Sequence, residues 1–122
     1  MAAIKSARFR QGTTPALTFT LEGEAVQDAT VYVTIRQQDI QLTKSNFRDC
    51  PAVTLEPVYD ENEQQIGTAI TCIYSQWETL HLRPTHAKVQ VRWIFEDKTA
   101  DESEIGRVEI GEALNKRIIA YG

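Results

Sequence analysis

The stretch GTTPALTFTL, residues 12–21, decides the fold, because a turn-forming cluster of Gly, Thr and Pro leads directly into alternating apolar and polar residues. Alternation with a period of two is typical of a strand that buries one of its faces. The same pattern recurs at residues 31–36 and again at residues 89–95. The chain is therefore predicted to be all-β.

Turn-forming residues divide the rest of the chain into further short extended segments. The expected strands are residues 4–9, 16–21, 30–37, 40–44, 52–59, 67–74, 87–95 and 104–110. Ser75 followed by Glu78 matches a capping box, which predicts a helical turn over residues 76–80. About seven or eight strands, separated by turns roughly every 8 to 12 residues, are typical of an antiparallel immunoglobulin-like β-sandwich. The sequence thus indicates such a sandwich with one short helical turn.

Length, composition and charge indicate one domain of ordinary type. A chain of 122 residues buries roughly two-thirds of its unfolded surface in one core. We expect a single β-sandwich domain over residues 1–122, with an N-terminal arm at 1–12 and a C-terminal tail at 115–122. The formal net charge of −4 disfavours a general nucleic-acid binder, because such proteins need a basic face against phosphates.

The sequence also bears on compartment and on the two cysteines. Its apolar runs are too short to span a membrane, and residues 1–8 lack the apolar core of a secretory signal. We therefore expect a protein made in the cytosol, without membrane association. Cys50 and Cys72 are expected to be free thiols. Because Cys72 alternates with Ile70 and Tyr74, it is predicted to lie in the core.

The residue types that carry catalysis or bind metals occur here without a matching motif. His81 and His86 have no cysteine or carboxylate at zinc-ligand spacing, so turn or surface positions are the preferred interpretation. The acidic clusters at residues 60–63 and 101–104 could offer oxygen atoms to calcium, but they lack EF-hand spacing and are interpreted as solvated hairpin turns. We expect no enzymatic activity, no cofactor and no metal site.

Aromatic residues suggest a second class of function. Trp93 alternates in phase with Val89 and Val91 and is predicted to lie in the core. Trp77 and Tyr74 could form a stacking platform for a ligand such as a sugar. Two interpretations of Trp77 stay open: it covers an open end of the sandwich, or it belongs to a carbohydrate-binding module.

Both ends of the chain are candidates for an assembly interface. Residues 116–121 combine two cations with an apolar run, and an extended segment of this kind can add itself to the open sheet edge of a neighbour. Pairing within its own domain is the alternative. Residues 4–9 could act in the same way at the other end of the chain. The candidate interface residues are Lys5, Arg8, Arg10, Arg117, Ile118, Ile119 and Tyr121.

Five segments carry a resemblance to a known group of proteins. They are RQGTTP at residues 10–15, FTL at 19–21, VYVTIRQ at 31–37, WETL at 77–80 and VQVRW at 89–93. In these segments the chain resembles small virion proteins of bacteriophages and prophages of gut Firmicutes and, more loosely, the immunoglobulin-like N-terminal domain of phage baseplate upper proteins.

The resemblance implies a non-enzymatic β-sandwich that packs against copies of itself or other virion proteins. A component of the tail, baseplate or connector is expected on this basis, assembled in the cytoplasm of the host bacterium and then part of the virion. A capsid decoration or head-fibre protein is the structural alternative. The carbohydrate-binding module is the alternative from another class.

Overall fold

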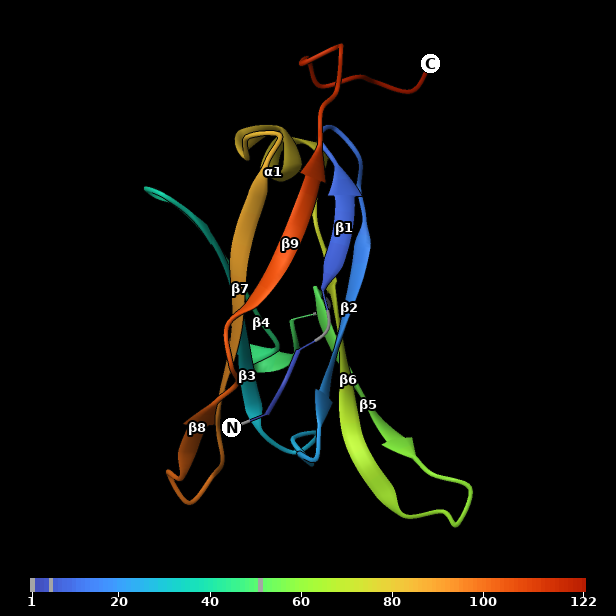
Figure 1. Ribbon diagram of the computed structural model, residues 1–122, viewed down its shortest axis with the longest axis vertical. Helices are drawn as coiled ribbons and strands as arrows, with labels where there is room; N and C mark the ends of the chain where they lie inside the picture. Colours follow the sequence, from blue (N-terminus) through green and yellow to red (C-terminus); the bar gives the residue numbers. More distant parts are fainter. Residues whose placement is uncertain (1, 5, 51) are drawn as a thin grey trace.

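The computed structural model describes residues 2–4, 6–50 and 52–122. Within them, nine strands form two sheets that pack face to face, which confirms the predicted all-β sandwich (Figure 1). The larger sheet contains β1 (Ala7–Arg10), β3 (Thr30–Gln37), β4 (Ile40–Ser45), β7 (His86–Ile94), β8 (Ala100–Glu102) and β9 (Gly106–Gly111). The smaller sheet contains β2 (Ala16–Glu22), β5 (Val53–Tyr59) and β6 (Gln65–Ile73). Two short helices, η1 (Phe47–Asp49) and α1 (Gln76–His81), complete the described elements.

The strand order identifies the type of sandwich. The larger sheet runs β1-β9-β7-β3-β4, with β8 paired to β7, and the smaller sheet runs β2-β6-β5. The orders β3-β7-β9 and β2-β6-β5 are those of strands C-F-G and B-E-D in an immunoglobulin-like fold, and β4 extends the first sheet as strand C′ does. β1 pairs with β9 in parallel, whereas the other strand pairs are antiparallel.

The core lies between the sheets and follows the alternation of the sequence. On β2, Leu17, Phe19 and Leu21 are buried, while Ala16 and Thr18 are exposed. Full burial of an apolar side chain of this size contributes about 1.5–3 kcal/mol, so a slip of one residue in register would expose the whole apolar set. The predicted core positions of Trp93 and Cys72 are confirmed.

The strand prediction differs from the structure in the region after β7. Residues 96–101 were expected to form a loop before one strand at 104–110, but β8 and β9 form there instead. Ser103 separates them: its buried Oγ accepts a hydrogen bond from the N–H of Val91 (3.0 Å) and donates to the carbonyl of Glu104 (2.8 Å). Because this hydroxyl bonds the partner strand in place of a backbone group, the strand is interrupted there. The described residues contain nine strands, whereas the sequence predicted seven or eight.

The predicted helical turn is confirmed as α1. Ser75 Oγ accepts a hydrogen bond from the N–H of Glu78 (3.2 Å), and the Glu78 carboxylate accepts one from the N–H of Ser75 (2.9 Å). Glu78 also forms a salt bridge of 2.7 Å with Lys44 on β4. The helix is therefore attached to the edge of the larger sheet. Neither this helix nor any other in the described part of the chain has the length and hydropathy of a membrane span.

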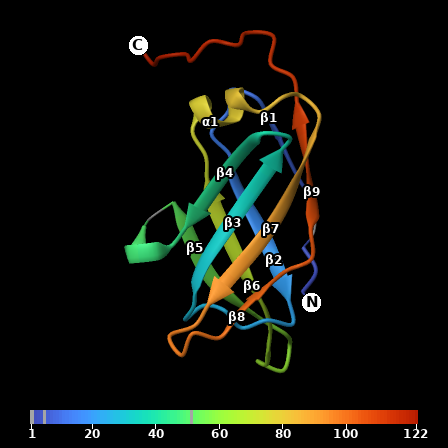
Figure 2. The same cartoon turned by 90° about the vertical axis from the view of Figure 1, so that its left-hand side faces the viewer.

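The sandwich has two different ends. The loops β2–β3, β5–β6 and β7–β8 lie at one end, and α1 and the C-terminal tail lie at the other (Figures 1 and 2). This arrangement follows from the alternating directions of the strands. It separates loop residues from tail residues by the full length of the sandwich.

Candidate functional site

The C-terminal tail leaves the sandwich after β9 and forms no strand. Residues 112–122 run past α1 across one end of the molecule (Figure 2). Their large apolar side chains are exposed, with Leu114 at 99% and Tyr121 at 108% of the reference surface. Ile118 and Ile119 are also exposed. The tail thus carries apolar surface that the described part of its own domain does not bury.

Two glutamine side chains hold the tail where it passes the sandwich. The amide of Gln76 bonds the main chain of Ile119. The amide of Gln11 is buried: its Nε2 donates to the carbonyl of Leu82 (2.6 Å), and its Oε1 accepts from the N–H of Ala113 (3.1 Å) and from the ammonium of Lys116. A hydrogen bond contributes a net of about 0.5–1.5 kcal/mol. The tail is therefore held against the sandwich by a few hydrogen bonds, and it buries little of its apolar surface there.

Part of the N-terminal segment is paired within its own sheet. Residues 7–10 form β1, whose register places Arg8 opposite Glu109 and Arg10 opposite Gly111 of β9. Arg8 and Arg10 are exposed on this strand. Because β1 is paired within its own sheet, exchange of residues 7–10 with a neighbour would require that pairing to open. Lys5 lies outside the described residues.

The two aromatic rings proposed as a ligand platform lie in different environments. Trp77 on α1 is 56% exposed, and its ring packs on that of His81 at 4.6 Å between centroids. Tyr74 is buried, because its side chain continues the inward phase of Cys72. Its N–H donates a hydrogen bond to the carbonyl of Pro15 (3.1 Å). Trp77 and Tyr74 therefore do not form a shared exposed platform.

Burial governs the chemistry of the groups beneath α1. Desolvation raises the pKa of the Cys72 thiol to about 12, although Tyr74 and Lys44 act in the opposite direction. Desolvation and the nearby thiol also raise the pKa of Tyr74. The Tyr74 hydroxyl has no hydrogen-bond partner among the described residues. Both groups are neutral at physiological pH, and thiolate chemistry at Cys72 is suppressed. Cys50, by contrast, is exposed.

Acidic side chains at the loop end organise their own turns. Asp60 accepts hydrogen bonds from the N–H groups of Asn62 and Gln64, both at 2.9 Å. Asp97 accepts one from the N–H of Thr99 (2.9 Å), and hydrogen bonding to Thr99 lowers the pKa of this carboxyl. In the part of the chain that the structure describes, no three His, Cys, Asp or Glu side chains gather as a metal site would require.

Several buried polar residues position the loops. Local sequence patterns did not indicate this role. Gln37 bonds the main chain of the α1–β7 connection: its Nε2 donates to the carbonyl of Arg83 (3.1 Å), and its Oε1 accepts from the N–H of Arg83 (2.7 Å). Thr68 donates to the carbonyl of Glu24 (2.8 Å). Alternation does predict that Gln37 faces inward with Ile35, but its partners are distant in the sequence.

No protein-family model matches this chain, and no curated protein matches it significantly. The fold defines the class, an immunoglobulin-like β-sandwich with an unpaired C-terminal tail.

Proposed function

We propose that this protein is a non-enzymatic structural component of a bacteriophage virion, in the tail, baseplate or connector, and that it acts by protein–protein assembly. Its partners are copies of itself and other virion proteins, and it is incorporated into the particle in the cytoplasm of the host bacterium. The phage assignment is supported by the resemblance in the segments quoted above. The assembly role is supported by the exposed apolar tail.

The tail is the single observation that carries the assembly role. Its exposed apolar side chains are Leu114, Ile118, Ile119 and Tyr121. Each side chain that a neighbour buries contributes about 1.5–3 kcal/mol. An extended segment without strand pairing also has free main-chain donors and acceptors, which suit it to a sheet edge on a second copy. Edge strands β4 and β5 each have one side unpaired among the described strands.

Light scattering on a size-exclusion column tests the assembly role. The full chain is compared with a chain that ends at Gly111, and with a chain of full length in which Leu114, Ile118, Ile119 and Tyr121 are changed to Ser. We expect a defined oligomer for the full chain and monomers for both variants. A full chain that is monomeric, or an oligomer that survives both changes, would contradict assembly through the tail.

The virion assignment needs a separate measurement. Mass spectrometry of purified phage particles from the bacterium that encodes the chain should detect it at a fixed ratio to the major tail proteins. Detection at capsid stoichiometry would instead indicate a decoration protein. Quenching of tryptophan fluorescence by glycans, lost in Trp77→Ala, would indicate the carbohydrate-binding module.

A further inference from the structure

Cations face one another across the outer side of the larger sheet. The register places Arg36 of β3 directly opposite Lys88 of β7, and Lys88 directly opposite Arg107 of β9. All three side chains are exposed. Arg107 pairs with Glu109, whereas Arg36 and Lys88 make no ion pair within the described residues. Like charges placed opposite each other on neighbouring strands destabilise a sheet. An anionic partner bound to this row would offset the repulsion between its cations.

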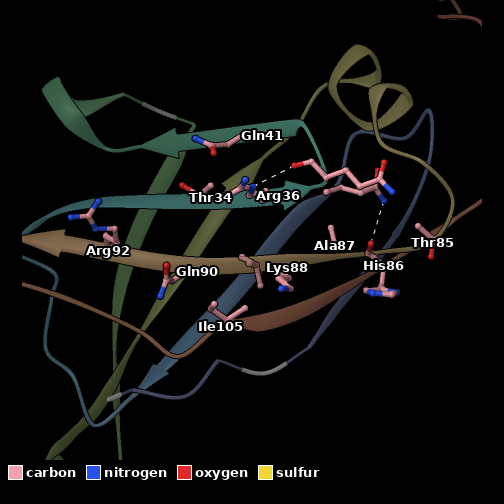
Figure 3. Close-up of a pocket in the computed structure, with 13 residues that line it drawn as sticks. Thr34, Arg36, Gln41, Thr85, His86, Ala87, Lys88, Gln90, Arg92 and Ile105 are labelled. Atoms are coloured by element: carbon pink, nitrogen blue, oxygen red, sulfur yellow. Dashed lines mark hydrogen bonds between the residues drawn. The ribbon is translucent and has the colours of Figure 1, made fainter.

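Arg36 and Lys88 line a concavity on this side of the larger sheet. It has a volume of about 880 Å³ and lies along β3 and β7 (Figure 3). Arg36 and Lys88 line it beside the side-chain amides of Gln41 and Gln90, and Arg92, which also lines it, forms a salt bridge of 3.8 Å with Glu102. None of the described residues that line it is Asp or Glu. Guanidinium, ammonium and amide N–H groups are donors, so the lining suits carboxylates.

The opposite charge is concentrated at the loop end of the same molecule. The loops β2–β3 (residues 23–29), β5–β6 (60–64) and β7–β8 (95–99) lie at the end opposite α1, with the β5–β6 and β7–β8 hairpins on opposite sides of it (Figure 1). Their acidic residues are Glu24, Asp28, Asp60, Glu61, Glu63, Glu96 and Asp97, and Lys98 is their only cation. Since Asp60 and Asp97 hold their own turns, the acidic loops have a defined shape.

We propose that the acidic loop end of one copy docks in the basic concavity of a second copy. The two surfaces are complementary in charge and lie on different parts of the molecule, so the contact is head-to-tail and leaves one copy with a free basic concavity and the other with a free acidic loop end. Repetition of such a contact generates a ring or a helical filament. The inference rests on the proposed assembly role, but on residues other than those of the tail.

Overall charge favours this occupant over a nucleic acid. With a net charge of −4, copies of the chain repel one another in most orientations. The chain also repels a nucleic acid, which is negatively charged throughout. An oriented approach that brings the acidic loops to the basic concavity is attractive at short range. Complementary potentials of this type set orientation and partner choice, and salt weakens them.

Paired charge reversals test the contact. One variant carries Arg36→Glu and Lys88→Glu, and the other carries Glu61→Lys and Glu96→Lys. Asp60 and Asp97 are retained because they shape the turns. Sedimentation velocity at low salt is expected to show association of the wild-type chain that is about tenfold or more weaker in each variant alone. An equimolar mixture of the two variants should associate again, because each then offers a surface complementary to the other.

An exposed position outside both surfaces supplies a control. Arg48 lies on η1, and Arg48→Glu should associate like the wild-type chain. High salt should dissociate the wild-type contact and the restored mixture alike. Circular dichroism of each variant confirms that the sandwich is intact, since all substituted side chains are exposed.

Three outcomes would overturn the inference. They are wild-type association that both reversals leave unchanged, a mixture that stays dissociated, and a wild-type chain that is monomeric at low salt at its highest soluble concentration. If the serine-substituted tail abolishes assembly while both charge reversals assemble normally, the proposed function stands and the charged interface does not. If only the Arg36 and Lys88 reversal weakens association, the occupant is not the loop end of a second copy.

Discussion

Gln76 and Ile119 are joined by two hydrogen bonds although they lie 43 residues apart. Nε2 of Gln76 donates to the carbonyl of Ile119 at 3.1 Å, and its Oε1 accepts from the N–H of Ile119 at 2.9 Å. The side chain thus pairs with the tail as a neighbouring strand would. The path of the tail over α1 depends on this amide and on Gln11 rather than on burial of its apolar side chains.

Replacing Gln76 should free the distal tail without unfolding the sandwich. In Gln76→Leu we expect faster hydrogen exchange at the amide of Ile119 and faster proteolysis of residues 116–122, with a change in unfolding free energy of about 1 kcal/mol or less. Gln41→Leu, an exposed glutamine on β4, serves as the control and should change neither rate. An unchanged exchange rate at Ile119 in Gln76→Leu would show that the tail is held by something else.

The salt bridge between Lys44 and Glu78 should make stability depend on pH. Desolvation raises the pKa of Glu78, but hydrogen bonds from Lys44 and from the Ser75 backbone outweigh it, and the net shift is downward from 4.5. A carboxyl with a lowered folded-state pKa contributes stability that is present above its unfolded pKa and is lost as pH falls through its folded pKa.

We therefore expect Glu78→Gln to be less stable than the wild type at pH 7, by about 1 kcal/mol. Urea unfolding across pH should show this difference shrinking as pH falls from the ordinary glutamate pKa of 4.5 through the lower pKa of the folded state, because the wild-type carboxyl becomes protonated over that range. A difference that stays constant down to pH 3 would contradict the role of the charge. Glu56→Gln on β5 is the control.

Removing the hydroxyl of Tyr74 should not destabilise the protein. The ring is buried and its oxygen has no hydrogen-bond partner among the described residues. Because an unsatisfied buried hydroxyl costs roughly 1–3 kcal/mol of desolvation, Tyr74→Phe is expected to raise the unfolding free energy or leave it unchanged. Tyr59→Phe, at an exposed ring, is the control. A loss of stability in Tyr74→Phe beyond that control would reveal a bond to the hydroxyl.

The two thiols should differ sharply in reactivity. Burial raises the pKa of Cys72 to about 12, while Cys50 is exposed. In the native protein we expect a disulfide reagent to modify the Cys50 thiol quickly. The Cys72 thiol should react only when the protein unfolds. Cys50→Ser should abolish the fast reaction. Fast labelling that persists in this variant would place Cys72 within reach of solvent.

Lys88 should lower the stability of the isolated chain. It lies between Arg36 and Arg107 on the neighbouring strands, so Lys88→Glu exchanges two repulsions for two attractions. The monomer is expected to gain about 0.2–1 kcal/mol in thermal unfolding, with a smaller gain for the neutral Lys88→Gln. If both variants were less stable than the wild type, the cation row would not be a source of strain.

Local sequence patterns predicted most elements of this fold. Alternation located β2, β3, β4 and β7 within one or two residues, and the Ser75–Glu78 capping box located α1. These signals are reliable because they depend on residues adjacent in the chain. The interruption at Ser103 was missed, since it depends on a bond between this hydroxyl and Val91 of the partner strand.

The sequence by itself determined most of the strands, which of their faces enter the core, and that the tail is apolar. Only the tertiary structure decided that β8 and β9 are separate strands, that β1 pairs with β9, and that Arg36 and Lys88 lie side by side. The physical reason is the range of the forces involved. Alternation is set by solvent acting on each segment alone, whereas partner and register are set by packing between segments distant in the chain.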